Sequence, residues 1–251
     1  MESVTQSPRL NLIVSISTIA LFLSSWLVAN VDIGESVTWV SAFFIVILAV
    51  PSYYYWLKWL PFKRGLYILL FLSIFPIIIE AIGITTGLPY GGFHYTDEMG
   101  YKILGLVPWS VSFAFGPLVI GSVAVAATIS RDPRIALPLG AILLVIFDLI
   151  LDPAAVLLNI WVWDTPGLYY GIPITNYTGW LLTGFIVCVL LHAMTSDSFQ
   201  SLAEFPRQLS VSLLLIVSFW TGYSLWAALV IPTIIGIGMM TYLTFFLQKV
   251  E

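Results

Sequence analysis

The sequence predicts an all-α integral membrane protein, a polytopic bundle of about eight transmembrane helices. Of its 251 residues, 60% are apolar and only 9% are charged, whereas a soluble domain carries roughly 25% charged residues. The mean hydropathy is +1.01, and several apolar runs are long enough to cross a hydrocarbon core of about 30 Å. We therefore expect residues 1–251 to form a single transmembrane domain in the cell membrane.

The predicted spans are long apolar windows, and the first of them follows a short polar N-terminus. This first window is too long for the core of a signal peptide and lacks a small-residue cleavage site, so we interpret it as a retained helix. Length and hydropathy identify the other seven windows. In chain order the predicted ranges are Leu10–Asn30, Val37–Leu57, Leu66–Ile84, Val107–Ser130, Ile135–Trp161, Thr175–Met194, Leu209–Trp220 and Leu225–Leu247.

The number of spans depends on the last two windows, which only Thr221–Ser224 separates, so seven spans are the alternative. Basic residues near span ends collect on the cytoplasmic side of a membrane. With eight spans and both termini in the cytoplasm, only Lys102 falls outside, whereas seven spans would put Lys249 outside as well. Eight spans therefore fit better, and the basic residues placed inside are Arg9, Lys58, Lys63, Arg64, Arg131, Arg134, Arg207 and Lys249.

Two long connections lie on the predicted outer side, Thr85–Leu106 and Val162–Ile174. Both are rich in glycine and aromatic residues and do not resemble flexible polar linkers. We expect ordered, partly buried segments here, forming a lid over an apolar site.

The third and fifth spans carry three carboxylates, and ionisable residues inside a membrane are candidates for function. At a rise of about 1.5 Å per residue, Glu80, Asp148 and Asp152 lie roughly 21–27 Å beyond the arginine at the inner end of their span. All three therefore share a depth in the outer part of the membrane. Hydrogen bonds that merely fix the bundle are the alternative role for these groups.

Asp148 and Asp152 are four residues apart, which puts them on one face of the fifth helix. Asn159 continues that face, and Pro153 should free the backbone carbonyl of Leu149 from the helical ladder. Two carboxylates this close in an apolar setting repel, so we expect one of them to keep its proton. A protonated carboxyl beside an ionised one is a usable acid/base pair.

The sixth span brings further polar and aromatic side chains to the same depth. Asn176, Trp180 and Gly184 share a face near its outer end, so a polar pocket in an apolar wall is expected. Aromatic faces attract cations, although tryptophan and tyrosine also gather at membrane interfaces without any such role. His94 lies within reach of this pocket, whereas His192, near the inner end, is expected to be structural, so the histidines predict no metal site.

Two sequence blocks carry a family resemblance. The first is Glu80 followed by GITTGLPYGGFHY at Gly83–Tyr95; the second is DLILDP at Asp148–Pro153, WVW at Trp161–Trp163, YYGIP at Tyr169–Pro173 and NYTGW at Asn176–Trp180. In order and spacing they resemble the membrane carotenoid biosynthesis hydratases, which include the bisanhydrobacterioruberin and gamma-carotene hydratases. The likeness covers about Glu80–Trp180.

The resemblance implies cofactor-independent addition of water to the terminal double bond of a linear carotenoid, giving a tertiary alcohol. Such chemistry needs a desolvated acid, electron density for a tertiary cation, and a base for the attacking water. We hypothesise that one of Asp148 and Asp152 is the acid and that the other, or Glu80, orients water. The residues expected to flank the cation or bind substrate are Trp161, Trp163, Trp180, Tyr90, His94, Tyr95, Tyr170 and Asn176.

Other functions stay open at this point. A lycopene-type end-group cyclase or isomerase would share the acid and the cation. A transporter or a carotenoid-binding protein would also place acids inside a membrane. The expected partners are a hydrophobic polyene, water and the lipid bilayer, with a carotenoid elongase as a candidate supplier of substrate. Neither a metal, another cofactor nor nucleic acid is expected.

Overall fold

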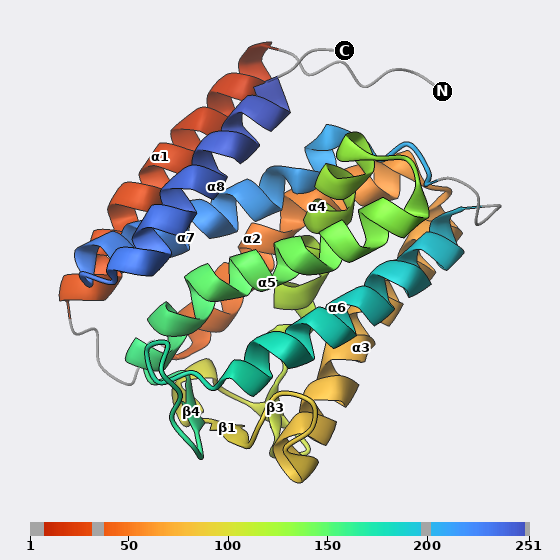
Figure 1. Cartoon of the computed structure of the whole chain (residues 1–251). Helices are drawn as coiled ribbons and strands as arrows, with labels where there is room; N and C mark the ends of the chain where they lie inside the picture. Colours follow the sequence, from red (N-terminus) through yellow and green to blue (C-terminus); the bar gives the residue numbers. More distant parts are fainter. Residues whose placement is uncertain (1–7, 32–37, 197–201, 249–251) are drawn as a thin grey trace.

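The computed structural model describes residues 8–31, 38–196 and 202–248, and helices dominate it (Figure 1). Within these ranges, eight helices are long and apolar enough to cross a membrane. This confirms the all-α polytopic class. The helices are α1 (Pro8–Asn30), α2 (Thr38–Trp59), α3 (Phe62–Thr86), α4 (Val111–Ile129), α5 (Pro133–Leu157), α6 (Ile174–Thr195), α7 (Val211–Trp226) and α8 (Val230–Gln248).

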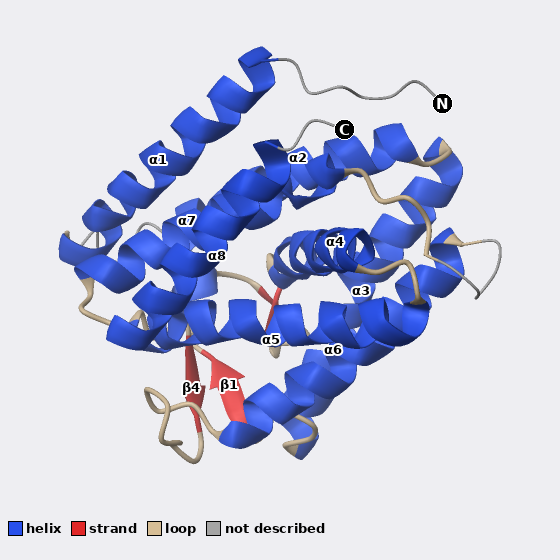
Figure 2. Cartoon of the chain, turned by 45° about the horizontal axis from the view of Figure 1, so that its top comes forward, coloured by secondary structure: helices blue, strands red, loops and turns tan. Residues whose placement is uncertain are grey.

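Short strands occupy one end of the bundle, which we call the strand end (Figure 2). Strand β1 (Phe93–Tyr95) pairs antiparallel with β4 (Trp161–Trp163), and β2 (Lys102–Ile103) pairs antiparallel with β3 (Val107–Pro108). Two short 3-10 helices, η2 (Asp97–Met99) and η3 (Arg207–Ser210), complete the elements. The two glycine-rich connections therefore contain regular structure, as predicted.

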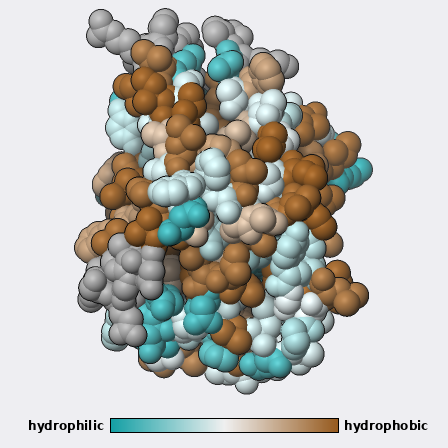
Figure 3. All heavy atoms as spheres, turned by 90° about the vertical axis from the view of Figure 1, so that its left-hand side faces the viewer, coloured by the Kyte–Doolittle hydropathy of each residue, from teal (hydrophilic) through white to brown (hydrophobic). Residues whose placement is uncertain are grey.

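Helix α7 lies at the centre of the bundle and is buried along most of its length. It packs against α1 and α8 on one side and against α2, α4 and α5 on others. Helices α1, α3 and α8 instead leave many leucine and isoleucine side chains exposed, as a lipid-facing surface requires. In Figure 3 hydrophobic residues cover much of one face, with hydrophilic ones gathered mainly at the lower, strand-bearing end.

Two predicted helix boundaries were wrong because strands replace the helix ends. Helix α4 begins at Val111 and not at Val107, since Val107–Pro108 form β3. Helix α5 ends at Leu157 and not at Trp161, since the chain turns and enters β4. Asn159 has a backbone φ of 55° and follows the helix, so it does not continue the aspartate face.

The predicted break between the last two helices was also misplaced. Residues Thr221–Ser224 lie inside α7, and the chain turns near Ala228, whose φ is 58°. The small residues serve close helix packing: a Cβ on Gly222 would overlap the backbone carbonyl of Phe22 on α1. Gly236 on α8 is similarly close to Thr221. Small residues at crossings let membrane helices approach, so they did not mark a loop.

The beginning of α1 and the end of α8 lie together at the end opposite the strands (Figure 1). Lys102 is at the strand end, where its Nζ atom lies 2.7 Å from an oxygen of exposed Asp97. The hydrogen bond and charge of Lys102 lower the pKa of Asp97. Lys249 is outside the described residues. Which end faces the cytoplasm stays a prediction from the basic residues.

Candidate active site at the strand end

An aspartate pair on α5 is held by one amide from α6. Asp152 is buried and Asp148 half-buried. The side-chain nitrogen of buried Asn176 donates to an oxygen of Asp148 at 2.9 Å and to an oxygen of Asp152. An amide nitrogen carries two hydrogens, so one side chain can serve both acceptors. Asn176 therefore fixes the spacing of the pair.

The third carboxylate, Glu80 on α3, is partnered by a tyrosine of β1. The Tyr95 hydroxyl donates to Glu80 Oε2 at 2.6 Å, and both side chains are buried. Burial, followed by the charge of Glu80, raises the pKa of Tyr95 well above its ordinary value. The hydroxyl therefore keeps its proton and stays a donor to Glu80.

The carboxylates of α3 and α5 border the same buried cluster. Tyr95, which donates to Glu80, and Tyr177, which follows Asn176, both belong to this cluster, and Leu149 of α5 packs against it. Burial is again the main cause that raises the pKa of Tyr90. The structure thus brings together the three carboxylates that the sequence placed at one depth.

Pro153 and the connection before α6 together shape the end of α5. Proline has no N–H to donate, so the carbonyl of Leu149 is left without its helical partner, as predicted. The Tyr169 hydroxyl supplies the missing hydrogen bond at 2.9 Å. Tyr169 lies in a tight hairpin closed by bridges between Gly167 and Gly171 and between Tyr169 and Ile172. The hairpin is therefore tied to the helix at Leu149, between the two aspartates.

Strands β1 and β4 set aromatic rings beside the carboxylates. Phe93 faces Trp163 and Tyr95 faces Trp161 in the strand register, with ring centroids 5.2 and 5.8 Å apart respectively. Side chains alternate across a strand, so the buried Phe93 and Tyr95 share a face. The rings of Trp163 and Trp161 therefore pack against Phe93 and against Tyr95, the partner of Glu80.

Tyr90 forms a wedge between α3 and α6. A Cβ on Gly83 of α3 would come within 2.9 Å of the Tyr90 ring, and one on Gly179 of α6 within 2.7 Å. The Tyr90 hydroxyl donates to Thr183 Oγ1 at 3.0 Å. Its ring lies 5.5 Å from that of Trp180. The Tyr90 ring therefore occupies the space that a side chain at either glycine would fill. It also lies beside the Trp180 ring.

Two of the predicted substrate-binding residues point elsewhere. His94 lies on the exposed face of β1, opposite to Phe93 and Tyr95, and its Nδ1 is 3.6 Å from an oxygen of Asp164. The Tyr170 hydroxyl accepts a hydrogen bond from the backbone N–H of Ile231 at 3.3 Å. The structure does not bring either polar group to the carboxylates.

Tyr169 and Tyr177, two further aromatic residues of the second sequence block, also lie in the site, although they were not among the predicted substrate-binding residues. Their rings contact each other, with centroids 5.8 Å apart. The sequence signal for Tyr177 is that it directly follows Asn176. Within the described ranges, no group of three or more histidine, cysteine, aspartate or glutamate side chains is arranged to hold a metal ion.

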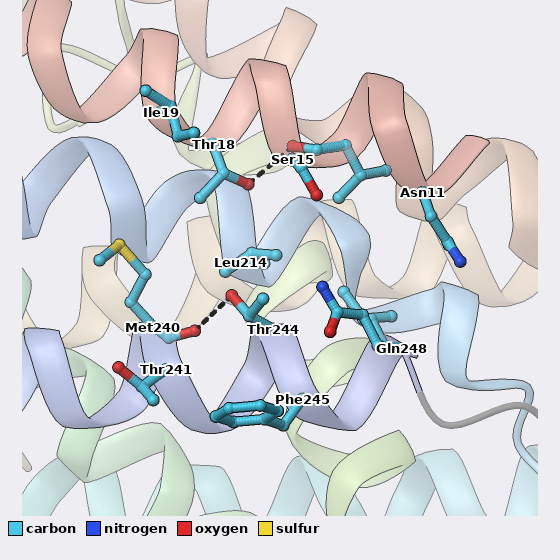
Figure 4. Close-up of a pocket in the computed structure, with 12 residues that line it drawn as sticks. Asn11, Ser15, Thr18, Ile19, Leu214, Met240, Thr241, Thr244, Phe245 and Gln248 are labelled. Atoms are coloured by element: carbon cyan, nitrogen blue, oxygen red, sulfur yellow. Dashed lines mark hydrogen bonds between the residues drawn. The ribbon is translucent and has the colours of Figure 1, made fainter. Parts of the chain in front are cut away.

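A separate groove of about 380 Å³ lies between α1 and α8 (Figure 4). Its lining includes Asn11 and Thr18 on α1, and Thr244 and Gln248 on α8. The Thr18 and Thr244 hydroxyls donate to carbonyls of their own helices. These hydroxyls are thus satisfied within their helices, and most of the surface that lines the groove is apolar. The groove lies away from the carboxylates.

Comparison with known proteins gives concordant similarities. A family model described as "Carotenoid biosynthesis protein" matches residues 36–243. Bisanhydrobacterioruberin hydratase of Haloarcula japonica is 32% identical over 191 residues, which cover 71% of this chain and 64% of that protein. The chain thus matches less than two thirds of this relative's length. No solved structure matches the chain significantly.

Proposed function

Because the chain belongs to the carotenoid biosynthesis protein family, we propose that it is a carotenoid hydratase, a hydro-lyase of the 1,2-hydratase type. It adds water to the terminal carbon–carbon double bond of a linear carotenoid, acyclic or monocyclic, and yields a tertiary alcohol. The observation that carries this proposal is the aspartate pair bridged by Asn176 inside an aromatic site. A polyene has no charge, and its hydration needs an acid and a base in an apolar setting.

The proposed reaction begins with proton transfer from the aspartate pair. We assign one proton to the pair, because two carboxyl groups that accept from the same amide nitrogen in an apolar setting would repel each other if both were ionised. That carboxyl gives its proton to the less substituted alkene carbon, and the π electrons form the new C–H bond. The neighbouring tertiary carbon becomes a cation. Asn176 holds both carboxyls in place throughout.

Water then captures the cation. Its oxygen forms the C–O bond, and one of its protons passes to the ionised member of the pair, which restores one proton to the pair. The net change is addition of one water molecule. Glu80, fixed by the Tyr95 hydroxyl, contributes negative charge near the cation. The faces of Trp161, Trp163 and Trp180 add electron density, at about 0.5–2 kcal/mol per close contact.

The site is proposed to lie near the outer face of the cell membrane. The basic residues at the end opposite the strands support an orientation with that end in the cytoplasm. A carotenoid elongase would supply the substrate from within the same bilayer.

Expression in a lycopene-producing host tests the proposal, with mass analysis of the extracted carotenoids. We expect products heavier by one water molecule per modified end. Asp152→Asn should lower the yield by about 10²–10⁴-fold, the usual worth of a general acid or base. A product of unchanged mass with altered absorption would instead indicate a cyclase or isomerase. Unchanged lycopene, followed by an unchanged elongated acyclic carotenoid, would reject hydration.

A further inference from the structure

Tyr177 differs from the other tyrosines of the site in its hydroxyl. It lies in the first turn of α6, its side chain is 8% exposed, and its oxygen is buried without a hydrogen-bond partner among the described residues. The hydroxyls of the other tyrosines of the site are engaged: Tyr90 with Thr183, Tyr95 with Glu80 and Tyr169 with Leu149. A buried hydroxyl without a partner is costly, so a ligand is expected at this oxygen.

The surroundings of the hydroxyl indicate which ligand it would bind. Asn176, the preceding residue, donates to both aspartates, and the Tyr177 ring packs on that of Tyr169. The Tyr169 hydroxyl in turn donates to the backbone carbonyl of Leu149, which lies between the two aspartates in the chain. The ligand must therefore be small, must hydrogen-bond to a hydroxyl, and must lie near a carboxylate.

We propose that the Tyr177 hydroxyl binds the water molecule that adds to the substrate and holds it against Asp152. This inference rests on the proposed function. Water accepts a hydrogen bond from Tyr177 and donates one to the Asp152 carboxylate, which leaves a lone pair for the cation. When the C–O bond forms, the proton passes from water to Asp152. Tyr177 keeps its own proton, so it positions water and does not take part in the proton transfer.

The test is Tyr177→Phe, assayed in D2O with the purified, detergent-solubilised full chain. Without a positioned water, the cation loses a proton or deuteron to a carboxylate and becomes an alkene again more often than water captures it. We expect the ratio of alcohol to deuterium-labelled, unhydrated carotenoid to fall by on the order of tenfold to a hundredfold. This ratio does not depend on how much folded enzyme is present.

Two control variants separate this role from a structural one. Tyr169→Phe removes the hydrogen bond to Leu149, so it should lower total turnover and leave the ratio unchanged. Tyr53→Phe removes the buried hydroxyl of a half-buried tyrosine on α2, which lies against Gly116 of α4, and should change neither quantity.

The outcomes distinguish the inference from the function on which it rests. An unchanged ratio in Tyr177→Phe, beside a wild type that hydrates, would overturn the water site alone. A marked loss of thermal stability in Tyr177→Phe would also overturn it, because the hydroxyl would then be bonded within the protein. A wild type that forms neither alcohol nor deuterated carotenoid would reject the proposed function, and this inference with it.

Discussion

The side-chain amide of Asn176 connects the two aspartates of α5. An amide is neutral, yet here it donates to both carboxylates of a pair inside a membrane span. Hydrogen bonds to charged groups are worth about 1.5–3 kcal/mol each, so one side chain offsets part of the cost of burying the pair. Asn176 was predicted to bind substrate, and the structure adds that its amide holds the two aspartates together.

Replacing Asn176 tests that support. Asn176→Ala should reduce alcohol formation by on the order of tenfold or more, because both aspartates lose their common donor. Asn176→Asp should be worse, since a third carboxyl would repel the pair. Alcohol yield per amount of membrane-inserted protein is the measurement, and Asn11→Ala on α1 is the matched control. Full activity in Asn176→Ala would show that the bridge is dispensable.

Tyr95 and Glu80 should behave as one unit. Tyr95→Phe leaves a buried carboxylate without its donor and should destabilise the protein by about 1–3 kcal/mol. Once Glu80→Gln has been introduced, the same tyrosine change should cost less. A double-mutant cycle on thermal unfolding in detergent measures this coupling. Strict additivity of the two substitutions would mean that the 2.6 Å contact contributes nothing.

At the scale of elements, helix ends were harder to predict than helix centres. Hydropathy identified eight spans because apolar length is a property of each segment alone. The ends of α4 and α5 depend on pairing between β1 and β4 and between β2 and β3, which are distant in the chain or too short to signal themselves. The turn between α7 and α8 was misplaced because Gly222 serves close packing of α7 on α1. In the sequence, a glycine in that role looks the same as a glycine in a turn.

The site itself could be predicted in part for the same reason. Carboxylates in apolar runs stand out, and the i, i+4 spacing of Asp148 and Asp152 fixed their shared face. The freed Leu149 carbonyl was also predictable, because proline always removes that bond. The identity of its donor, Tyr169, was not, since a hairpin 20 residues away supplies it. His94 and Tyr170 could not be oriented without the strand register.

The contact of Tyr90 with α3 and α6 predicts that a larger residue in place of Gly179 will disturb the packing of the site. Gly179→Ala would set a Cβ 2.7 Å from the Tyr90 ring and 2.8 Å from the carbonyl oxygen of Pro89, so something must shift. We expect lower thermal stability and lower alcohol yield. Gly238→Ala on α8 is the matched control, because no atom lies within 4 Å of its Cβ. Equal behaviour of the two variants would remove the packing role assigned to Gly179.

For the whole molecule, the orientation in the membrane is the open prediction. Leu168, at the hairpin tip, and Phe62, at the other end, are both exposed, whereas the native Cys188 is buried. A membrane-impermeant thiol reagent applied to intact cells should label Leu168→Cys. Phe62→Cys should be labelled only after the membrane is permeabilised. The reverse pattern would place the strand end in the cytoplasm.

Four tyrosine hydroxyls join the strand-end connections to four different helices: Tyr90 to α6, Tyr95 to α3, Tyr169 to α5 and Tyr170 to α8. Cysteines at His94 and Val162, which face each other across β1 and β4, should form a disulfide that leaves alcohol production unchanged. Activity lost on oxidation and restored by reductant would show that the strands must part. If activity survives the disulfide, these connections form a fixed cover over the site, and the proposed carotenoid substrate would have to enter laterally from the lipid phase. The substrate and its alcohol would then pass between enzymes by diffusing within the bilayer, without ever crossing into water.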